Sequence, residues 1–191
     1  MHARIALTSL AFLAACGPGN SLSGTVAGTG FTIKEAIIGP VKSSSKGSGL
    51  TTTAAGLILS DTAGWCDALK ANRMKKNTRS MVILLTNRPD QSTQLAPAAG
   101  DFTVTQQSSA LGNLASAQVL DLDGTCTRSS DPDARLATSG LVKLTQLKLE
   151  ANGTASGELD LTFGPQKDKV TGTFNATYCE FPPTAGSPSC E

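Results

Sequence analysis

The sequence predicts an all-β protein, a single antiparallel β-sandwich or barrel-like domain with one short helix. In the last third of the chain, apolar and polar residues alternate with a period of two, as in SGELDLTFG at 156–164. Gly and Asn punctuate these runs, and Asn152-Gly153 is a typical two-residue hairpin signal. A chain of 191 residues is long enough for one domain with a substantial core.

The strands follow from the same alternation. The segments 139–150, 156–164 and 170–179 are expected to form an antiparallel meander. The run MVILL at 81–85 lacks alternation, which is typical of a strand buried on both faces. Further strands are expected at 22–28, 31–38, 54–59, 81–86, 101–105 and 115–122.

One helix is expected within SDTAGWCDALKANR at 60–73. Ser60 or Asp61 can cap its first turn, and Cys66 and Leu69 then share one face. Segments rich in Ser, Gly, Thr and Pro predict loops at 42–53, 88–100 and 125–138, the first of them a mobile hairpin loop, and a tail at 182–191.

The N-terminus has the layout of a secretory signal. Arg4 supplies a positive charge, and the eleven residues 5–15 are mostly apolar, too few to span a bilayer. Leu13 breaks the small-residue rule for ordinary cleavage after Ala15. The quartet Leu13-Ala14-Ala15-Cys16 instead resembles the lipobox of bacterial lipoproteins. This resemblance implies that Cys16 becomes the lipidated first residue and anchors the chain to a membrane.

The resulting organisation is a signal peptide at 1–15, an anchor and tether at 16–21, a β-rich domain at 22–181 and the tail. Gly17 rather than Asp follows the cysteine, which by the sorting rule for some lipoproteins favours the outer membrane. The segments CDALKANR, DGTC and VTGTFNATYCE extend the similarity to a group of uncharacterised bacterial lipoproteins. That resemblance implies a place in the cell envelope and no particular activity.

The composition excludes several classes of catalytic, metal-binding and nucleic-acid-binding site. The only histidine, His2, lies in the signal segment, so the mature chain lacks the imidazole of Ser-His-Asp and Cys-His catalysis and of common zinc sites. Of the 16 Lys and Arg residues, 15 remain without Arg4, against 15 Asp and Glu residues. No net charge therefore favours nucleic acid as a partner. No cofactor is expected.

Four cysteines follow Cys16, and in an exported protein an even number favours disulfides over metal ligation. They are Cys66, Cys126, Cys179 and Cys190. Four cysteines allow three pairings. Local closure favours Cys179–Cys190 with Cys66–Cys126, and the alternative that we weigh joins Cys66 to the tail and Cys126 to Cys179.

Two charged clusters are weaker candidates. Carboxylates in DLDGTCTRSSDPD could hold calcium, although the EF-hand order fails and turn formation explains the same string; they are Asp121, Asp123, Asp131 and Asp133. Cations near the helix end could contact lipid phosphates or another anionic envelope polymer, or could simply complement the helix dipole; they are Lys70, Arg73, Lys75, Lys76 and Arg79.

The sequence therefore favours a membrane-anchored, non-enzymatic binding or scaffolding domain of the cell envelope. Its expected partners are the membrane, through the N-terminal lipid, and an envelope protein or polymer. The alternative is a hydrolase without histidine that works with two carboxylates, which would require two acidic groups converging in a cleft.

Overall fold

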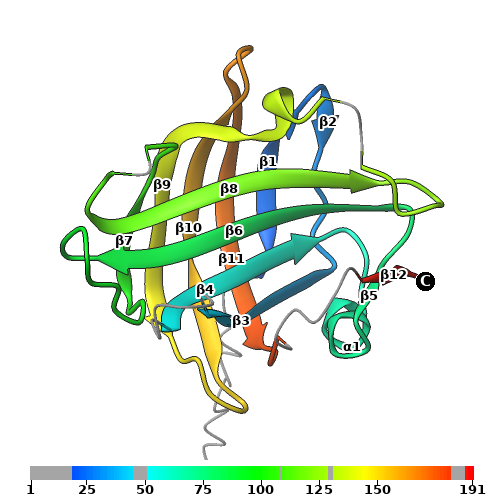
Figure 1. Cartoon of the computed structure of the whole chain (residues 1–191). Coiled ribbons are helices and arrows are strands. Elements are labelled where there is room, and N and C mark those ends of the chain that lie inside the picture. Colours follow the sequence, from blue (N-terminus) through cyan, green and yellow to red (C-terminus); the bar gives the residue numbers. More distant parts are fainter. Residues whose placement is uncertain (1–18, 45–50, 108, 129–130, 182–187) are drawn as a thin grey trace, which may run out of the picture.

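The computed structural model describes residues 19–44, 51–107, 109–128, 131–181 and 188–191. The predicted signal segment and Cys16 lie outside these residues, as does 182–187 of the tail. Within the described part of the chain eight strands close into a barrel, so the all-β prediction is confirmed and the sandwich alternative is wrong (Figure 1). The wall runs through β3 (Glu35–Ser44), β4 (Thr51–Ser60), β6 (Thr78–Arg88), β8 (Gly112–Leu122), β7 (Gly100–Val104), β9 (Ala137–Leu147), β10 (Thr154–Phe163) and β11 (Asp168–Tyr178), which returns to β3.

Smaller elements cover the outside and one end of the barrel. β1 (Ser21–Val26) pairs with the first half of β11 and forms a hairpin with β2 (Thr29–Gly30). On the outside lie α1 (Trp65–Lys70), β5 (Arg73–Met74) and β12 (Ser189–Cys190), with β12 paired to β5 (Figure 1). The short helix η1 (Asp133–Arg135) precedes β9. Among the described residues no helix is long and apolar enough to span a bilayer.

The predicted meander is confirmed. β9, β10 and β11 pair in sequence as antiparallel neighbours over most of their length. Asn152 has a φ of 63° at the β9–β10 connection, the left-handed conformation that Asn tolerates well. Local alternation was sufficient to predict these strands, but the predicted two-residue hairpin is wrong, because residues 148–153 connect β9 to β10.

The wall is not antiparallel throughout, contrary to the sequence prediction. β3 and β11 run parallel at Ile37↔Thr177 and Ile38↔Tyr178, and β7 and β8 run parallel at Thr103↔Leu114 and Val104↔Ala115. We call these two short ladders the parallel seams. Parallel neighbours require a crossover connection, and no local residue pattern reveals that β11 must come back to β3.

The barrel interior is filled with apolar side chains. The inward residues of β6, Met81, Ile83 and Leu85, are fully buried, and the largest buried rings are Phe102, Phe163 and Phe174. An eight-strand barrel is just wide enough for side chains to fill it. The interior is therefore a core, and any binding surface must lie outside it.

The outward side of β6 differs from the prediction of burial on both faces. Val82 is partly covered by the outer apolar cluster beneath α1, whereas Leu84 is 38% exposed. The inward residues of the run MVILL therefore pack in the core, and its outward residues lie on the outer side of the barrel.

The predicted short helix forms, but its cap differs. Gly64, with φ 85°, occupies the N-cap position without a side-chain hydrogen bond. Instead, the carboxylate of Glu35 on β3 accepts a hydrogen bond from the Trp65 backbone N–H at 2.7 Å. Ser60 ends β4, and its hydroxyl accepts from the Trp65 indole Nε1 at 2.7 Å. A distant carboxylate thus replaces the expected local cap.

Several strand boundaries also change: β6 covers Thr78–Arg88 rather than 81–86, and β8 begins at Gly112 rather than at residue 115. β3 begins at Glu35 rather than at residue 31, and the β3–β4 ladder continues to Ser44↔Thr51. The ladder therefore includes both ends of the loop predicted at 42–53, and the remaining residues, 45–50, lie outside the described part of the chain. The loop predicted at 88–100 is confirmed between β6 and β7.

The disulfides join Cys66 to Cys179 and Cys126 to Cys190. Both pairings considered from the sequence are wrong. β11 ends beside β3, which brings Cys179 to the helix, whereas β12 pairs with β5 and carries Cys190 toward Cys126. Tertiary pairing outweighs the short separation that favoured local closure.

Candidate functional site

The chain turns outward immediately after each parallel seam. After Val104 the described residues 105–107 and 109–111 lie outside the β7–β8 ladder, and 105–107 line a groove with Ser116 of β8. After Tyr178 the segment 179–181 leaves the ladder, and the Phe181 ring lies against Gly39 of β3. Each departing segment forms one side of a groove on the outer surface. We call them the seam groove, beside β7 and β8, and the tail groove, beside β3 and β4.

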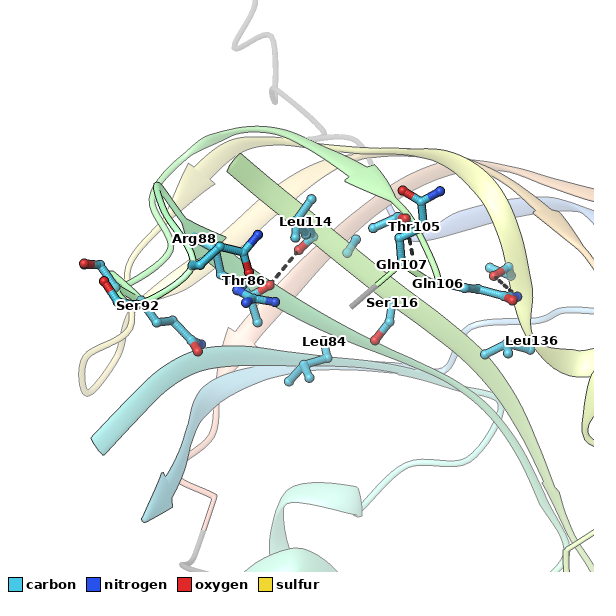
Figure 2. Close-up of a pocket in the computed structure, with 15 residues that line it drawn as sticks. Leu84, Thr86, Arg88, Ser92, Thr105, Gln106, Gln107, Leu114, Ser116 and Leu136 are labelled. Carbon is cyan, nitrogen blue, oxygen red and sulfur yellow. Dashed lines mark hydrogen bonds between the residues drawn. The ribbon is translucent and has the colours of Figure 1, made fainter. Parts of the chain in front are cut away.

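The seam groove has a volume of about 670 Å³. Ser92 and Arg88 lie at one end, Gln106 and Leu136 lie toward the other, and Ser116 lies between them (Figure 2). The uncharged polar side chains that line it are Thr86, Gln91, Ser92, Thr93, Gln94, Thr105, Gln106, Gln107 and Ser116. The apolar lining consists of Leu84, Leu114, Ala115, Leu136 and Ala137.

An interruption of the barrel wall underlies this groove. β7 pairs with β8 only as far as Val104↔Ala115, and the next contact along β8 is the isolated bridge Gln118↔Leu136. Between these points the Gln106 amide donates to the Ala137 carbonyl at 3.3 Å. A glutamine side chain therefore bridges a stretch where a strand would otherwise pair.

One side of the groove is the β6–β7 loop, which is held by a carboxylate turn. Asp90 Oδ1 accepts hydrogen bonds from the Ser92 hydroxyl and backbone N–H, each at 2.8 Å, and from the Thr93 N–H at 2.7 Å. These bonds, with the Ser92 hydroxyl foremost, lower the pKa of Asp90 to about 2. The loop closes where Leu95 N–H donates to the Asn87 carbonyl at 2.8 Å. Four lining residues, 91–94, lie within this closed loop.

The amides of the groove already make main-chain contacts. Gln91 Nε2 donates to the Ser109 carbonyl at 2.8 Å, which links the two groove-forming segments. Thr105 Oγ1 accepts from the Gln107 N–H at 3.0 Å. Arg88 supplies the positive charge of the described lining, which contains neither Asp nor Glu. The described lining is rich in hydrogen-bonding side chains and contains no carboxylate.

The tail groove is smaller, about 430 Å³, and mainly apolar. Val41, Ile58, Val82 and Leu84 come from the outside of the barrel, and Phe181 comes from the segment 179–181 that follows β11. Gly39 and Gly56 face each other in the β3–β4 ladder, and the Phe181 ring lies against both. A Cβ at Gly56 would approach that ring to 2.8 Å, so the absence of side chains makes room for Phe181.

The carboxylates considered for calcium have other roles or positions. Asp121 pairs with Arg79 at 2.6 Å and with Arg135 at 2.7 Å. Asp123 accepts from Thr125 and Thr127, which lowers its pKa, and Asp131 accepts from the Ala134 N–H. Asp133 lies exposed in η1. Among the described residues no group of three or more His, Cys, Asp or Glu side chains is placed to hold a metal ion.

The five cations predicted near the helix end do not form one cluster in the structure. Lys70, Arg73 and Lys76 are exposed near α1, and Lys75 pairs with Glu191 at 3.2 Å. Arg79 instead lies buried at one end of the barrel, where it donates to the carbonyls of Val26 and Thr29. Its guanidinium lies 4.7 Å from the centroid of the Phe31 ring. Arg79 therefore belongs to the closure of the barrel end.

Sequence reasoning did not single out the residues of the seam groove. The available signal is that four of the seven glutamines, Gln91, Gln94, Gln106 and Gln107, fall in two short segments. Only the fold places these segments beside each other. Compared with known proteins, the chain matches no protein-family model, no curated sequence and no solved structure.

Proposed function

We propose that this protein is a lipid-anchored, non-enzymatic binding module of the bacterial cell envelope, and that it holds its partner in the seam groove. The observation that carries the proposal is the groove's lining of uncharged hydrogen-bonding side chains without a carboxylate among the described residues. A carboxylate-dependent hydrolase needs two acidic groups in one cleft, and in the tail groove the described lining has only Glu180.

The anchor is supported by the lipobox at Leu13-Ala14-Ala15-Cys16 and by two disulfides, which persist in oxidising, extracytoplasmic compartments. The described chain begins against the barrel wall, where Gly19 O accepts from the Thr173 hydroxyl and Asn20 Oδ1 from the Asn175 N–H. Three residue steps span at most about 11 Å, so lipidation of Cys16 would hold the barrel close to the bilayer.

Membrane fractionation tests the anchor. The wild-type protein is expected in the membrane fraction after a carbonate wash, because several acyl chains hold a protein almost permanently. Cys16→Ser is expected in the soluble fraction, with unchanged far-UV circular dichroism. Sedimentation of the serine variant with washed membranes would contradict the lipid anchor.

Obstruction of the groove tests the binding function. Ser116 is exposed on the outside of β8, and a Phe at this position would fill the middle of the groove. The matched control is Thr171→Phe, because Thr171 is an exposed hydroxyl residue on β11. With capped uncharged peptides and chitotetraose as probes, at least one probe is expected to bind the wild-type and the Thr171→Phe protein but not Ser116→Phe. Equal binding to all three proteins would refute the groove as the binding site.

A further inference from the structure

We propose that the occupant of the seam groove is an extended, uncharged segment of another polypeptide, held by hydrogen bonds to its main chain. This inference rests on the function proposed above, because it specifies the ligand of the same groove. Three features of the groove carry it: the kind of polar groups, the repeat along its floor, and the absence of other recognition chemistry in its described lining.

The polar groups match the peptide main chain. A glutamine amide carries a carbonyl acceptor and two N–H donors, the same kinds of group that a peptide unit offers. Gln106 and Gln91 already donate to main-chain carbonyls, those of Ala137 and Ser109. Gln106 and Gln107 are both exposed. The groove therefore uses its amides as partners for main-chain groups within its own wall, and a bound segment presents the same groups.

The floor matches the repeat of an extended chain. Leu114 and Ser116 lie two residues apart on β8, and their cross-strand partners on β6 are Thr86 and Leu84. Alternate side chains of a strand recur at about 6.6–6.8 Å, so a segment lying along β8 presents every second side chain to this floor. Leu114 and Leu84 offer apolar contact for small side chains, and the polar rim remains for the main chain. Main-chain hydrogen bonds and contacts for alternate side chains are the two elements by which extended peptides are generally recognised.

The described lining lacks the side chains that would recognise other kinds of polymer. No aromatic residue lies there, so sugar rings and nucleobases have no stacking platform. The lining has no acidic residue to attract a basic segment, and its cation is Arg88. A volume of about 670 Å³ lies within the ordinary range of ligand sites, about 300–1,000 Å³. An uncharged stretch of extended chain is the occupant that these features fit.

A peptide array tests this inference with the lipidated full-length protein in detergent. The probes are capped decapeptides of random sequence drawn from Ala, Ser, Thr, Val, Leu, Asn and Gln, with matched sets that contain Lys or Glu. The uncharged set is expected to contain the strongest binders. In solution, the best peptide is expected to lose at least about tenfold in affinity to the double variant Gln106→Ala, Gln107→Ala, as two lost hydrogen bonds predict.

Two further measurements separate main-chain recognition from other modes of binding. Methylation of alternate peptide nitrogens removes main-chain donors, and we expect it to weaken binding at least about tenfold in one of the two registers. Gln146→Ala is the matched control, because Gln146 is an exposed glutamine on β9 that contacts Thr154 outside the groove. It is expected to bind like the wild-type protein.

The outcomes distinguish this inference from the proposed function. If chitotetraose binds in a manner that Ser116→Phe abolishes and no peptide does, the groove is a binding site but the peptide inference is wrong. If the best peptide tolerates methylation in both registers, main-chain recognition is also wrong. If neither kind of probe shows binding that depends on the groove, the proposed function and the peptide inference both fail.

Discussion

Leu84 lies where the wall of the barrel meets both grooves. It is an exposed leucine on the outward face of β6, and it lines the seam groove on one side and the tail groove on the other. Its neighbours on the same strand, Ile83 and Leu85, are fully buried in the core. The strand β6 therefore packs the core with Ile83 and Leu85 and exposes Leu84 for contact on the outer surface.

Asp90 offers a test of the loop that forms the rim. Because the hydrogen bonds lower its pKa from 3.8 to about 2, they stabilise the turn fully above the ordinary value and are lost only as pH falls through about 2. The amide signals of Ser92 and Thr93 in nuclear magnetic resonance spectra are expected to remain constant from pH 7 to about pH 4. A titration midpoint near the ordinary value of 3.8 would contradict the bonded turn.

Gly39 offers a test of the contact between the segment 179–181 and the barrel. A Cβ at this position would clash with the Cys179 carbonyl oxygen, which the disulfide holds in place. Gly39→Ala is therefore expected to lower the free energy of unfolding by about 1–3 kcal/mol, as overpacking does. Gly124→Ala is the control, because the nearest atom to an added Cβ lies 3.5 Å away on the Asn77 side chain. Urea denaturation measures both, and equal stability of the two variants would contradict the close approach.

At the scale of the elements, the two parallel seams decide where the grooves form. Each seam consists of only two residue pairs, and the chain leaves the wall directly after it. Antiparallel neighbours such as β9 and β10 are instead joined directly by the connection 148–153. The grooves are a consequence of the two crossovers rather than of any special loop composition.

The disulfides are tested at this scale because each holds an element to the barrel. Peptide mapping without reduction is expected to recover Cys66–Cys179 and Cys126–Cys190. Replacement of either pair by serine is expected to cost about 2–5 kcal/mol of unfolding free energy. Loss of Cys126–Cys190 should also free β12 from β5, which hydrogen exchange of the Glu191 amide reports, since that amide bonds to the Met74 carbonyl. Recovery of a Cys179–Cys190 peptide would overturn the structural pairing.

At the scale of the whole molecule, Arg79 closes one end of the barrel. It bonds to Asp121 on β8 and to the carbonyls of Val26 and Thr29 in the β1–β2 hairpin, and it stacks on Phe31. A charge that lies 9% exposed needs such partners in place of water, and both terminal nitrogens have them while the buried Nε has none among the described residues. Its position joins the N-terminal hairpin to the wall.

Arg79→Ala is expected to lower the free energy of unfolding by about 3 kcal/mol, because it leaves carbonyls and a carboxylate without their donor in a buried place. Arg79→Lys is expected to restore little, because a lysine cannot reproduce the forked contacts. The control is Lys169→Ala, since Lys169 pairs with Asp160 in an exposed position and such pairs contribute little. Thermal and urea unfolding decide the comparison, and equal losses for Arg79→Ala and Lys169→Ala would refute the closing role.

The sequence by itself determined the strands of the meander, a turn at Asn152 between two of them, the position of the short helix and the all-β class. These features depend on periodicity and turn chemistry within about ten residues, which the linear chain contains. The prediction of the mature N-terminus also depends on a local motif around Cys16, and it remains a prediction.

Only the tertiary structure decided the closure of the barrel, the disulfide pairing and the seam groove. Closure requires β11 to pair with β3 across more than half of the chain, and Cys66 and Cys179 are 113 residues apart. Gln91 and Gln106 come from separate loops and become neighbours of one groove because β7 joins β8 in parallel. Such pairings are selected by the burial of whole faces against each other, a property of the assembled sheet that no short window of sequence contains.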